Sequence, residues 1–190
     1  MAASEPCRAT AGQPPSGKQG IELLHGGIAD FVFGDWPHLV LHPPASVRGA
    51  ADDVLGQALQ HRTDAPVIGF FTNATGAKHM GIDWWREWLA EMQRDLPGNA
   101  SILQILVPGD RAPLQPGLPS VQSARLDVLA ATLARLDVFV AADSGPMHLA
   151  AAAGAPTIGL FRHTDPVAYT PLGPHCRALP SGELQPGSVA

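Results

Sequence analysis

The stretch Val138-Phe-Val-Ala-Ala-Asp-Ser-Gly-Pro-Met-His-Leu-Ala-Ala-Ala-Ala-Gly-Ala-Pro-Thr-Ile-Gly-Leu-Phe161 decides the fold class of this chain. It reads as a buried strand, a polar turn, an alanine-rich helix and a second buried strand. Gly154 and Pro156 stand where such a helix would end. A strand–helix–strand unit of this kind predicts parallel strands joined by a right-handed crossover.

The same alternation of strands and helices extends back to residue 66. Strands are expected at residues 67–71, 102–107, near 121, 137–142 and 157–161, and helices at 82–96, 126–136 and 146–153. The pattern predicts an α/β fold over residues 65–180, a Rossmann-like parallel sheet with helices on both faces.

The segments outside residues 65–180 carry weaker patterns. Residues 1–20 are rich in Pro, Gly, Ser and Ala and are expected to be disordered, and residues 181–190 are expected to form a flexible tail. Residues 21–64 are interpreted as a remnant or linker region. Its apolar runs at 21–24, 31–33 and 39–41 predict short strands or loops, and a helix is expected at 50–60.

Composition narrows the class of protein. The 190 residues are 45% hydrophobic, enough for one domain with a core, and the net charge of -5 gives no support to nucleic-acid binding. The sequence shows neither a signal-peptide pattern nor an apolar stretch of transmembrane length. Cys7 and Cys176 follow no metal or redox spacing, so we expect reduced thiols in a cytosolic protein.

Polar residues gather where the strand at 137–142 gives way to the following helix. Asp143, Ser144 and Gly145 form the turn, and His148 lies one helical turn further on. A helix N-terminus exposes unpaired N–H groups and partial positive charge. Open α/β sheets also bind ligands at the carboxyl ends of their strands. We therefore expect a phosphate-bearing ligand at this turn.

Each residue of this turn also has a structural interpretation. Asp143 or Ser144 can simply cap the helix, because these residue types are preferred caps. Gly145 can supply a positive φ rather than room for a ligand. His148 can be a structural histidine. These alternatives stay open at the level of the sequence.

Three residues after earlier strands are further candidates for the same ligand. Lys78 lies in a polar loop after the first strand, where a lysine can neutralise a phosphate, although it can also be a solvated loop residue. Thr72 can donate its hydroxyl in the same loop. Asp110, after the second strand, stands where a carboxylate often holds a ribose.

The sequence lacks the motifs of several other enzyme and cofactor-binding classes. The chain has no G-x-S-x-G, P-loop or G-x-G-x-x-G motif, and Ser144 has no evident base and orienting group for a serine hydrolase. His163 and His175 lie in a loop without metal-ligand spacing. No metal is therefore expected.

The run from Asp143 to Phe161, with Thr164-Asp165-Pro166 and Pro171-Leu-Gly-Pro-His175, resembles the C-terminal donor-binding half of the ADP-heptose:lipopolysaccharide heptosyltransferases, glycosyltransferase family nine. The likeness covers about residues 66–179. It implies that the Rossmann-like domain corresponds to one half of a GT-B glycosyltransferase. By this resemblance the residues that bind the nucleotide-sugar donor are Thr72, Lys78, Asp110, Asp143, Ser144, Gly145, Met147 and His148.

The resemblance also implies an activity and its partners. Such an enzyme transfers a sugar, here expected to be heptose, from an ADP-sugar to a lipopolysaccharide-core or related glycan or glycolipid, with inversion and without metal or other cofactor. It implies a cytoplasmic protein, with peripheral contact at the inner membrane through the acceptor. The catalytic base is not identified; Asp30 and Asp35 are the acids near the N-terminal apolar runs.

The chain also departs from the family. About sixty-five residues precede the donor-like domain, too few for the acceptor-binding domain of these enzymes. A truncated, non-catalytic nucleotide-sugar-binding module is therefore an alternative. A nucleotide-sugar epimerase-like enzyme is another, although His148 and Thr164-Asp165-Pro166 favour the glycosyltransferase family.

Overall fold

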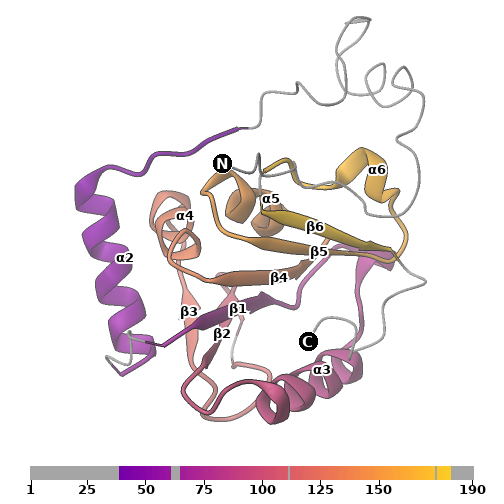
Figure 1. The fold of residues 1–190 in the computed structure, drawn as a ribbon, viewed down its shortest axis with the longest axis horizontal. Coiled ribbons are helices and arrows are strands. Elements are labelled where there is room, and N and C mark those ends of the chain that lie inside the picture. The colour runs from indigo at the N-terminus through magenta and orange to yellow at the C-terminus, as the bar shows by residue number, and fades with distance from the viewer. Residues whose placement is uncertain (1–38, 61–64, 111, 174, 181–190) are drawn as a thin grey trace, which may run out of the picture.

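The computed structural model describes residues 39–60, 65–110, 112–173 and 175–180 and shows a parallel sheet covered by helices (Figure 1). Over these residues the sheet has six strands in the order β3-β2-β1-β4-β5-β6, and every pair of neighbours is parallel. The strands are β1 (Val67–Phe71), β2 (Ser101–Leu106), β3 (Ser120–Gln122), β4 (Val138–Ala142), β5 (Thr157–Phe161) and β6 (Cys176–Pro180). The helices are α2 (Ala45–Ala58), η1 (Gly76–Lys78), α3 (Ile82–Asp95), α4 (Leu126–Leu133), α5 (Gly145–Ala152) and α6 (Pro166–Tyr169).

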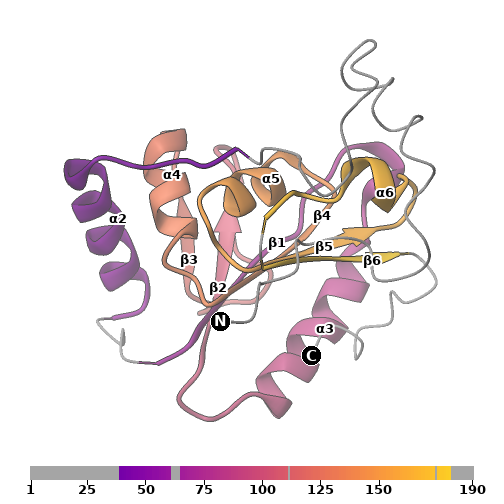
Figure 2. The same ribbon diagram turned by 45° about the horizontal axis from the view of Figure 1, so that its top comes forward.

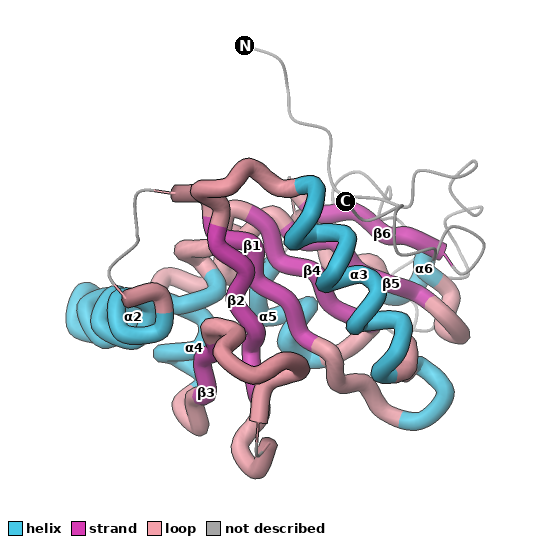
Figure 3. The backbone as a smooth tube through the Cα atoms, turned by 90° about the horizontal axis from the view of Figure 1, so that it is seen from below, coloured by secondary structure: helices cyan, strands magenta, loops and turns pink. Residues whose placement is uncertain are grey.

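Helices cover both faces of this sheet, as Figure 2 shows. α3 lies on one face because its apolar residues recur every three or four positions, which places Trp85, Trp88 and Leu89 in one core cluster with Phe70 of β1. α4 and α5 lie on the opposite face, with α2 packed against α4. The tube in Figure 3, seen from below, shows α3 lying in front of the sheet, between the labels of β4 and β5. The Rossmann-like α/β fold predicted from the sequence is confirmed.

α5 packs closely on the sheet because β5 carries a glycine beneath it. A Cβ atom built on Gly159 would lie 2.6 Å from the sulfur of Met147 in α5 and 2.8 Å from Cε2 of Phe161. Only a residue without a side chain leaves this space. Met147 is fully buried as a result.

The end of α5 follows the predicted stop signal. Gly154 has a φ of +88°, and its N–H donates to the carbonyl of Ala151, while the N–H of Ala155 donates to the carbonyl of Ala150. These two bonds form a Schellman motif, which needs a left-handed residue and so favours glycine. The helix therefore stops in time for the chain to enter β5.

The order of the strands fixes where a ligand can bind. β1 pairs on one side with β2 and on the other with β4, so the crossovers leave β1 and β4 in opposite directions. At such a switch point the loops after the two strands diverge and leave a crevice at the carboxyl edge of the sheet. The loops concerned are residues 72–78 after β1 and residues 143–145 after β4.

The local predictions outside the sheet fared differently. Of the strand or loop expected at 39–41, the structure shows a loop; Leu39 and Val40 are exposed, and the N–H of Leu41 donates to the carbonyl of Ala152 at the end of α5. α2 starts earlier than the expected helix and packs on α4, through a cluster that includes Val47, Ala51 and Val128. β6, η1 and α6 were not predicted. The runs at 21–24 and 31–33, Asp30, Asp35 and both predicted flexible ends lie outside the described residues.

Candidate functional site

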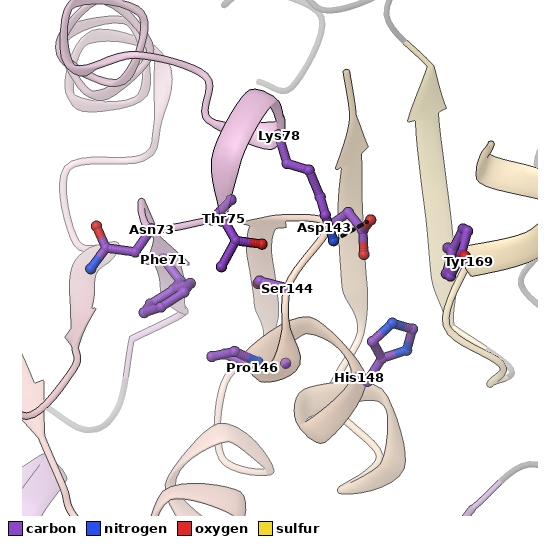
Figure 4. A pocket seen from close by; sticks show the side chains of 11 residues that line it. Phe71, Asn73, Thr75, Lys78, Asp143, Ser144, Pro146, His148 and Tyr169 are labelled. Carbon is purple, nitrogen blue, oxygen red and sulfur yellow. Dashed lines mark ion pairs between the residues drawn. The ribbon is translucent and has the colours of Figure 1, made fainter. Parts of the chain in front are cut away.

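A pocket lies at the switch point between β1 and β4. It has a volume of about 460 Å³ and opens at the carboxyl edge of the sheet. Figure 4 shows that its lining comes from the loop after β1, the turn after β4 with the start of α5, and α6. The lining residues are Phe71, Asn73, Ala74, Thr75, Lys78, Asp143, Ser144, Gly145, Pro146, His148 and Tyr169.

An ion pair joins the two loops of the switch point. Nζ of Lys78 lies 3.1 Å from Oδ2 of Asp143, as the dashed line in Figure 4 marks. The Asp143 side chain is 5% exposed, whereas that of Lys78 is 32% exposed. A carboxylate with so little access to water needs a positive or hydrogen-bonding partner. Lys78 supplies that charge and keeps part of its surface open to the pocket.

A third loop reaches the same carboxylate. Oγ1 of Thr164, which follows β5, donates to Oδ2 of Asp143 at 2.7 Å. The N–H of Asp143 donates to the carbonyl of Leu160 at 3.1 Å, which extends the pairing of β4 with β5 by one residue. Asp143 is therefore held by its backbone and by two neighbouring side chains.

The turn into α5 leaves polar groups available at the pocket. Ser144 precedes the helix in an extended conformation, but its side chain makes no capping hydrogen bond. Its hydroxyl is buried and has no hydrogen-bond partner in the described part of the chain. The structural interpretation of Ser144 as a helix cap is therefore not supported. A buried hydroxyl at a helix N-terminus is suited to donate to an anion.

Gly145 and His148 complete the mouth of α5. Gly145 does not have a positive φ, and apart from its chain neighbours and the backbone of α5 no atom of the described residues lies within 4 Å of the position that its Cβ would occupy. The glycine thus leaves open space at the first turn of the helix. Desolvation by the surrounding protein lowers the pKa of the His148 imidazole; the Asp143 carboxylate raises this pKa and Lys78 lowers it further. His148 is therefore more often neutral near pH 6.5 than a free histidine.

The structure brings five of the eight predicted donor-binding residues together in the pocket, and these are Lys78, Asp143, Ser144, Gly145 and His148. Thr72 does not line it. The side chain of Met147 is fully buried and serves the core, so it does not line the pocket. A contact between this residue and the donor stays a prediction.

Asp110 also lies outside the lining, but it contacts a residue of the pocket. Its carboxylate accepts a hydrogen bond from the N–H of Val107 at 2.9 Å and contacts Nδ2 of Asn73 at 3.3 Å. Asn73 lines the pocket. Asp110 thus closes its own turn and orients the carboxamide of Asn73, since only the amide nitrogen can donate to a carboxylate.

Sequence reasoning did not single out Asn73, Thr75 and Tyr169 as parts of the site. Asn73 and Thr75 belong to the same polar loop as Lys78, so their position after a buried strand was a usable signal. Tyr169 offered none, because it enters from α6, a helix of four residues. In the described parts of the chain, no group of three or more His, Cys, Asp and Glu side chains is placed to hold a metal ion.

The fold defines this chain as a Rossmann-like domain with a pocket at its topological switch point. Residues 122–187 match the family model of glycosyltransferase family 9 (heptosyltransferase). The resemblance to this family, seen in the sequence, is thereby confirmed. No curated protein matches the chain.

Solved structures show the same architecture. The chain is similar to a family 9 glycosyl transferase from Veillonella parvula DSM 2008, with 20% identity and a TM-score of 0.64 over 78% of this chain and 44% of that one. For E. coli ADP-heptose lps heptosyltransferase II, the sequence identity is 18% and the TM-score is 0.60, over 81% of this chain and 51% of that one. For E. coli heptosyltransferase WaaC with ADP, the sequence identity is 23% and the TM-score is 0.55, over 70% of this chain and 46% of that one. The chain thus spans about half the length of these proteins. None of the helices within the described ranges is both long and apolar enough to span a membrane.

Proposed function

We propose that this chain forms the donor-binding half of a family 9 glycosyltransferase and that the pocket between β1 and β4 binds the diphosphate of an ADP-sugar. The observation that carries the proposal is the meeting of Lys78 and the unpartnered hydroxyl of Ser144 at the N-terminus of α5. A cation, a free hydroxyl and a helix N-terminus together suit a phosphate group. E. coli WaaC, similar in fold, has been solved with ADP and with ADP-2-deoxy-2-fluoro heptose.

The reaction proposed for the whole enzyme is transfer of heptose to a lipopolysaccharide-core or related glycan. An acceptor hydroxyl attacks the anomeric carbon and loses its proton to a carboxylate base, while the bond from that carbon to the diphosphate oxygen breaks with inversion. In this chain Lys78 and the first turn of α5 would stabilise the negative charge that develops on the departing diphosphate. This mechanism uses no metal and no cofactor beyond the donor.

The acceptor side of the reaction is proposed from the family alone. A glycolipid acceptor would bring the enzyme to the cytoplasmic face of the inner membrane. The carboxylate base would come from the acceptor-binding side of the enzyme. Asp30 and Asp35, the acids considered from the sequence, lie outside the described residues.

Calorimetric titration with ADP and ADP-heptose tests the donor site. We expect the chain to bind both, and Lys78→Met to weaken binding roughly tenfold or more, as expected when a hydrogen bond between charged groups is lost. Arg86→Met is the matched control, because it removes one positive charge from an exposed residue of α3 that pairs only with Asp83 in the described structure. No binding at millimolar nucleotide by the folded chain would overturn the proposal.

A second measurement separates binding from transfer. Release of ADP from ADP-heptose is followed with and without a lipopolysaccharide-core acceptor. ADP release that depends on the acceptor indicates transfer by the chain itself. Binding without such release indicates a donor-binding half that needs an acceptor-binding partner. Epimerised nucleotide sugar among the products would instead favour the epimerase-like alternative.

A further inference from the structure

The polar side chains of the segment Thr164-Asp165-Pro166 have two different roles: one caps a helix and the other contacts the turn after β4. Oδ1 of Asp165 accepts a hydrogen bond from the N–H of Val167 at 2.9 Å and so caps α6, while Pro166 occupies its first turn. Both residues serve the local helix. Thr164 instead directs its hydroxyl out of the segment, toward Asp143 at the end of β4.

Both side-chain donors to Asp143 meet on one oxygen. Oδ2 receives Nζ of Lys78 at 3.1 Å and Oγ1 of Thr164 at 2.7 Å. The carboxylate belongs to the turn after β4, Lys78 to the loop after β1, and Thr164 to the loop after β5. A single oxygen therefore ties together three neighbouring loops at the edge of the sheet where the pocket opens.

The two donors differ in stiffness. Lys78 carries its ammonium group on a flexible stem of four carbons, so it follows the position of its partner. A carboxylate rotates readily about its last torsion, because that torsion has only broad minima. Thr164 is branched at Cβ and is therefore stiff at χ1. Of the three groups, the threonine hydroxyl has the least conformational freedom of its own.

We propose that Thr164 is a positioning residue of the pocket: its hydroxyl fixes Oδ2 of Asp143, and this oxygen in turn holds the ammonium group of Lys78 at the pocket. Thr164 does not line the pocket itself, so it acts through Asp143. The effect on ligand binding rests on the proposed function, in which Lys78 meets the diphosphate. The effect on the position of Lys78 does not depend on it.

The test compares Thr164→Val, which removes the hydroxyl but keeps the shape, with Thr164→Ser, which keeps the hydroxyl. Thr170→Val is the matched control, because it also removes a threonine hydroxyl from the segment after β5, but one that bonds locally to the carbonyl of Pro166 and not to Asp143. The first readout is the NMR signal of the Lys78 side chain, which is simple to assign because the sequence contains only one other lysine, Lys18. The second readout is the Kd for ADP.

We expect Thr164→Val to shift the Lys78 signal and to weaken ADP binding about tenfold, the size of one hydrogen bond to a charged group. Thr164→Ser should restore both readouts, and Thr170→Val should leave both unchanged. In a chain that already carries Asp143→Asn, adding Thr164→Val should change the Kd little, because the two residues act as one unit.

An unchanged Lys78 signal in folded Thr164→Val would overturn the inference, as would the same loss of affinity in Thr170→Val. If Thr164→Val does not fold, the smaller Thr164→Ala takes its place against the same serine variant. If the unmodified chain binds no ADP, the proposed function fails. The Lys78 signal then still decides whether Thr164 positions the lysine.

Discussion

Met147 and His148 are neighbours in α5, yet they belong to two different regions of the molecule. Met147 is fully buried between the helix and β5, where Gly159 makes room for its sulfur. His148 is exposed and lines the pocket at the mouth of the helix. Successive side chains of a helix point about 100° apart, so one residue can serve the core and the next the ligand.

The two regions differ in packing and in hydrogen bonding. The region around Met147 is apolar and closely packed, with no space for an added Cβ on Gly159. The pocket has a buried hydroxyl without a partner at Ser144 and open space beside Gly145. Substitutions in the first region should therefore change the stability of the fold, and substitutions in the second should change ligand binding.

The largest expected effect comes from truncating the packed side chain. Met147→Ala should lower the free energy of unfolding by about 2–5 kcal/mol, because it removes buried contacts and leaves a cavity. The affinity of the variant for ADP should stay within about twofold of the unmodified chain while it is folded, since this side chain does not reach the pocket. Urea unfolding and calorimetry at low temperature measure the two quantities.

A second change sharpens this prediction. Gly159→Ala alone should destabilise the fold by about 1–3 kcal/mol through overpacking. Combined with Met147→Ala it should cost less than the sum of the single changes, because the cavity receives the added methyl group. Strictly additive losses would show that the helix and β5 do not share this contact.

An intermediate effect, confined to binding, is expected at the mouth of α5. Ser144→Ala should leave the melting temperature unchanged or raise it slightly, because the hydroxyl has no partner to lose. The same change should weaken ADP binding about tenfold if the hydroxyl donates to a phosphate. Thermal unfolding and calorimetric titration give the two values.

Asp165→Ala is the control for this prediction. The Asp165 side chain does cap a helix, α6, so this variant should lower the melting temperature and leave the affinity for ADP nearly unchanged. If Ser144→Ala destabilises the chain as much as Asp165→Ala does, Ser144 is a helix cap after all.

The smallest effect should be a pH dependence of stability from His148. Burial lowers the folded pKa of this histidine below its ordinary value of 6.5, whereas the unfolded chain titrates near that value. Between the two pKa values the unfolded state binds more protons, so the free energy of unfolding falls as the pH drops below about 6.5. His148→Gln, which stays neutral, should flatten this part of the profile in urea titrations at pH 5–8.

The sequence predicted the sheet well because buried parallel strands and amphipathic helices have distinct periodicities. The strand at residues 67–71 and the helix from residue 82 match their observed positions closely. β6 was missed because its five residues, Cys176–Pro180, include an exposed arginine and a proline. The isolated run at 39–41 does not alternate with polar residues, so its sequence left strand and loop open.

The part of the pocket formed by residues directly after β1 and β4 could be predicted from the sequence. Residues after β1 and β4 meet because parallel strands end at one edge, which is why Lys78 and Asp143 were expected together. The sequence did not reveal that they form an ion pair, or that Thr164 donates to it, because these contacts depend on the order of β1, β4 and β5. The sequence also did not reveal that the Met147 side chain is buried, because the motif gives the spacing along the helix but not which side of the helix faces the sheet.

The pairing of β1 with β4 also has a consequence for how the chain folds. Ile68 lies opposite Val138, seventy positions later in the sequence. Contacts between such distant positions cost more loop-closure entropy than local ones and tend to slow the search for the native topology. We therefore expect the pocket residues after β1 and β4 to come together only once these two strands have paired, whereas individual helices can form earlier.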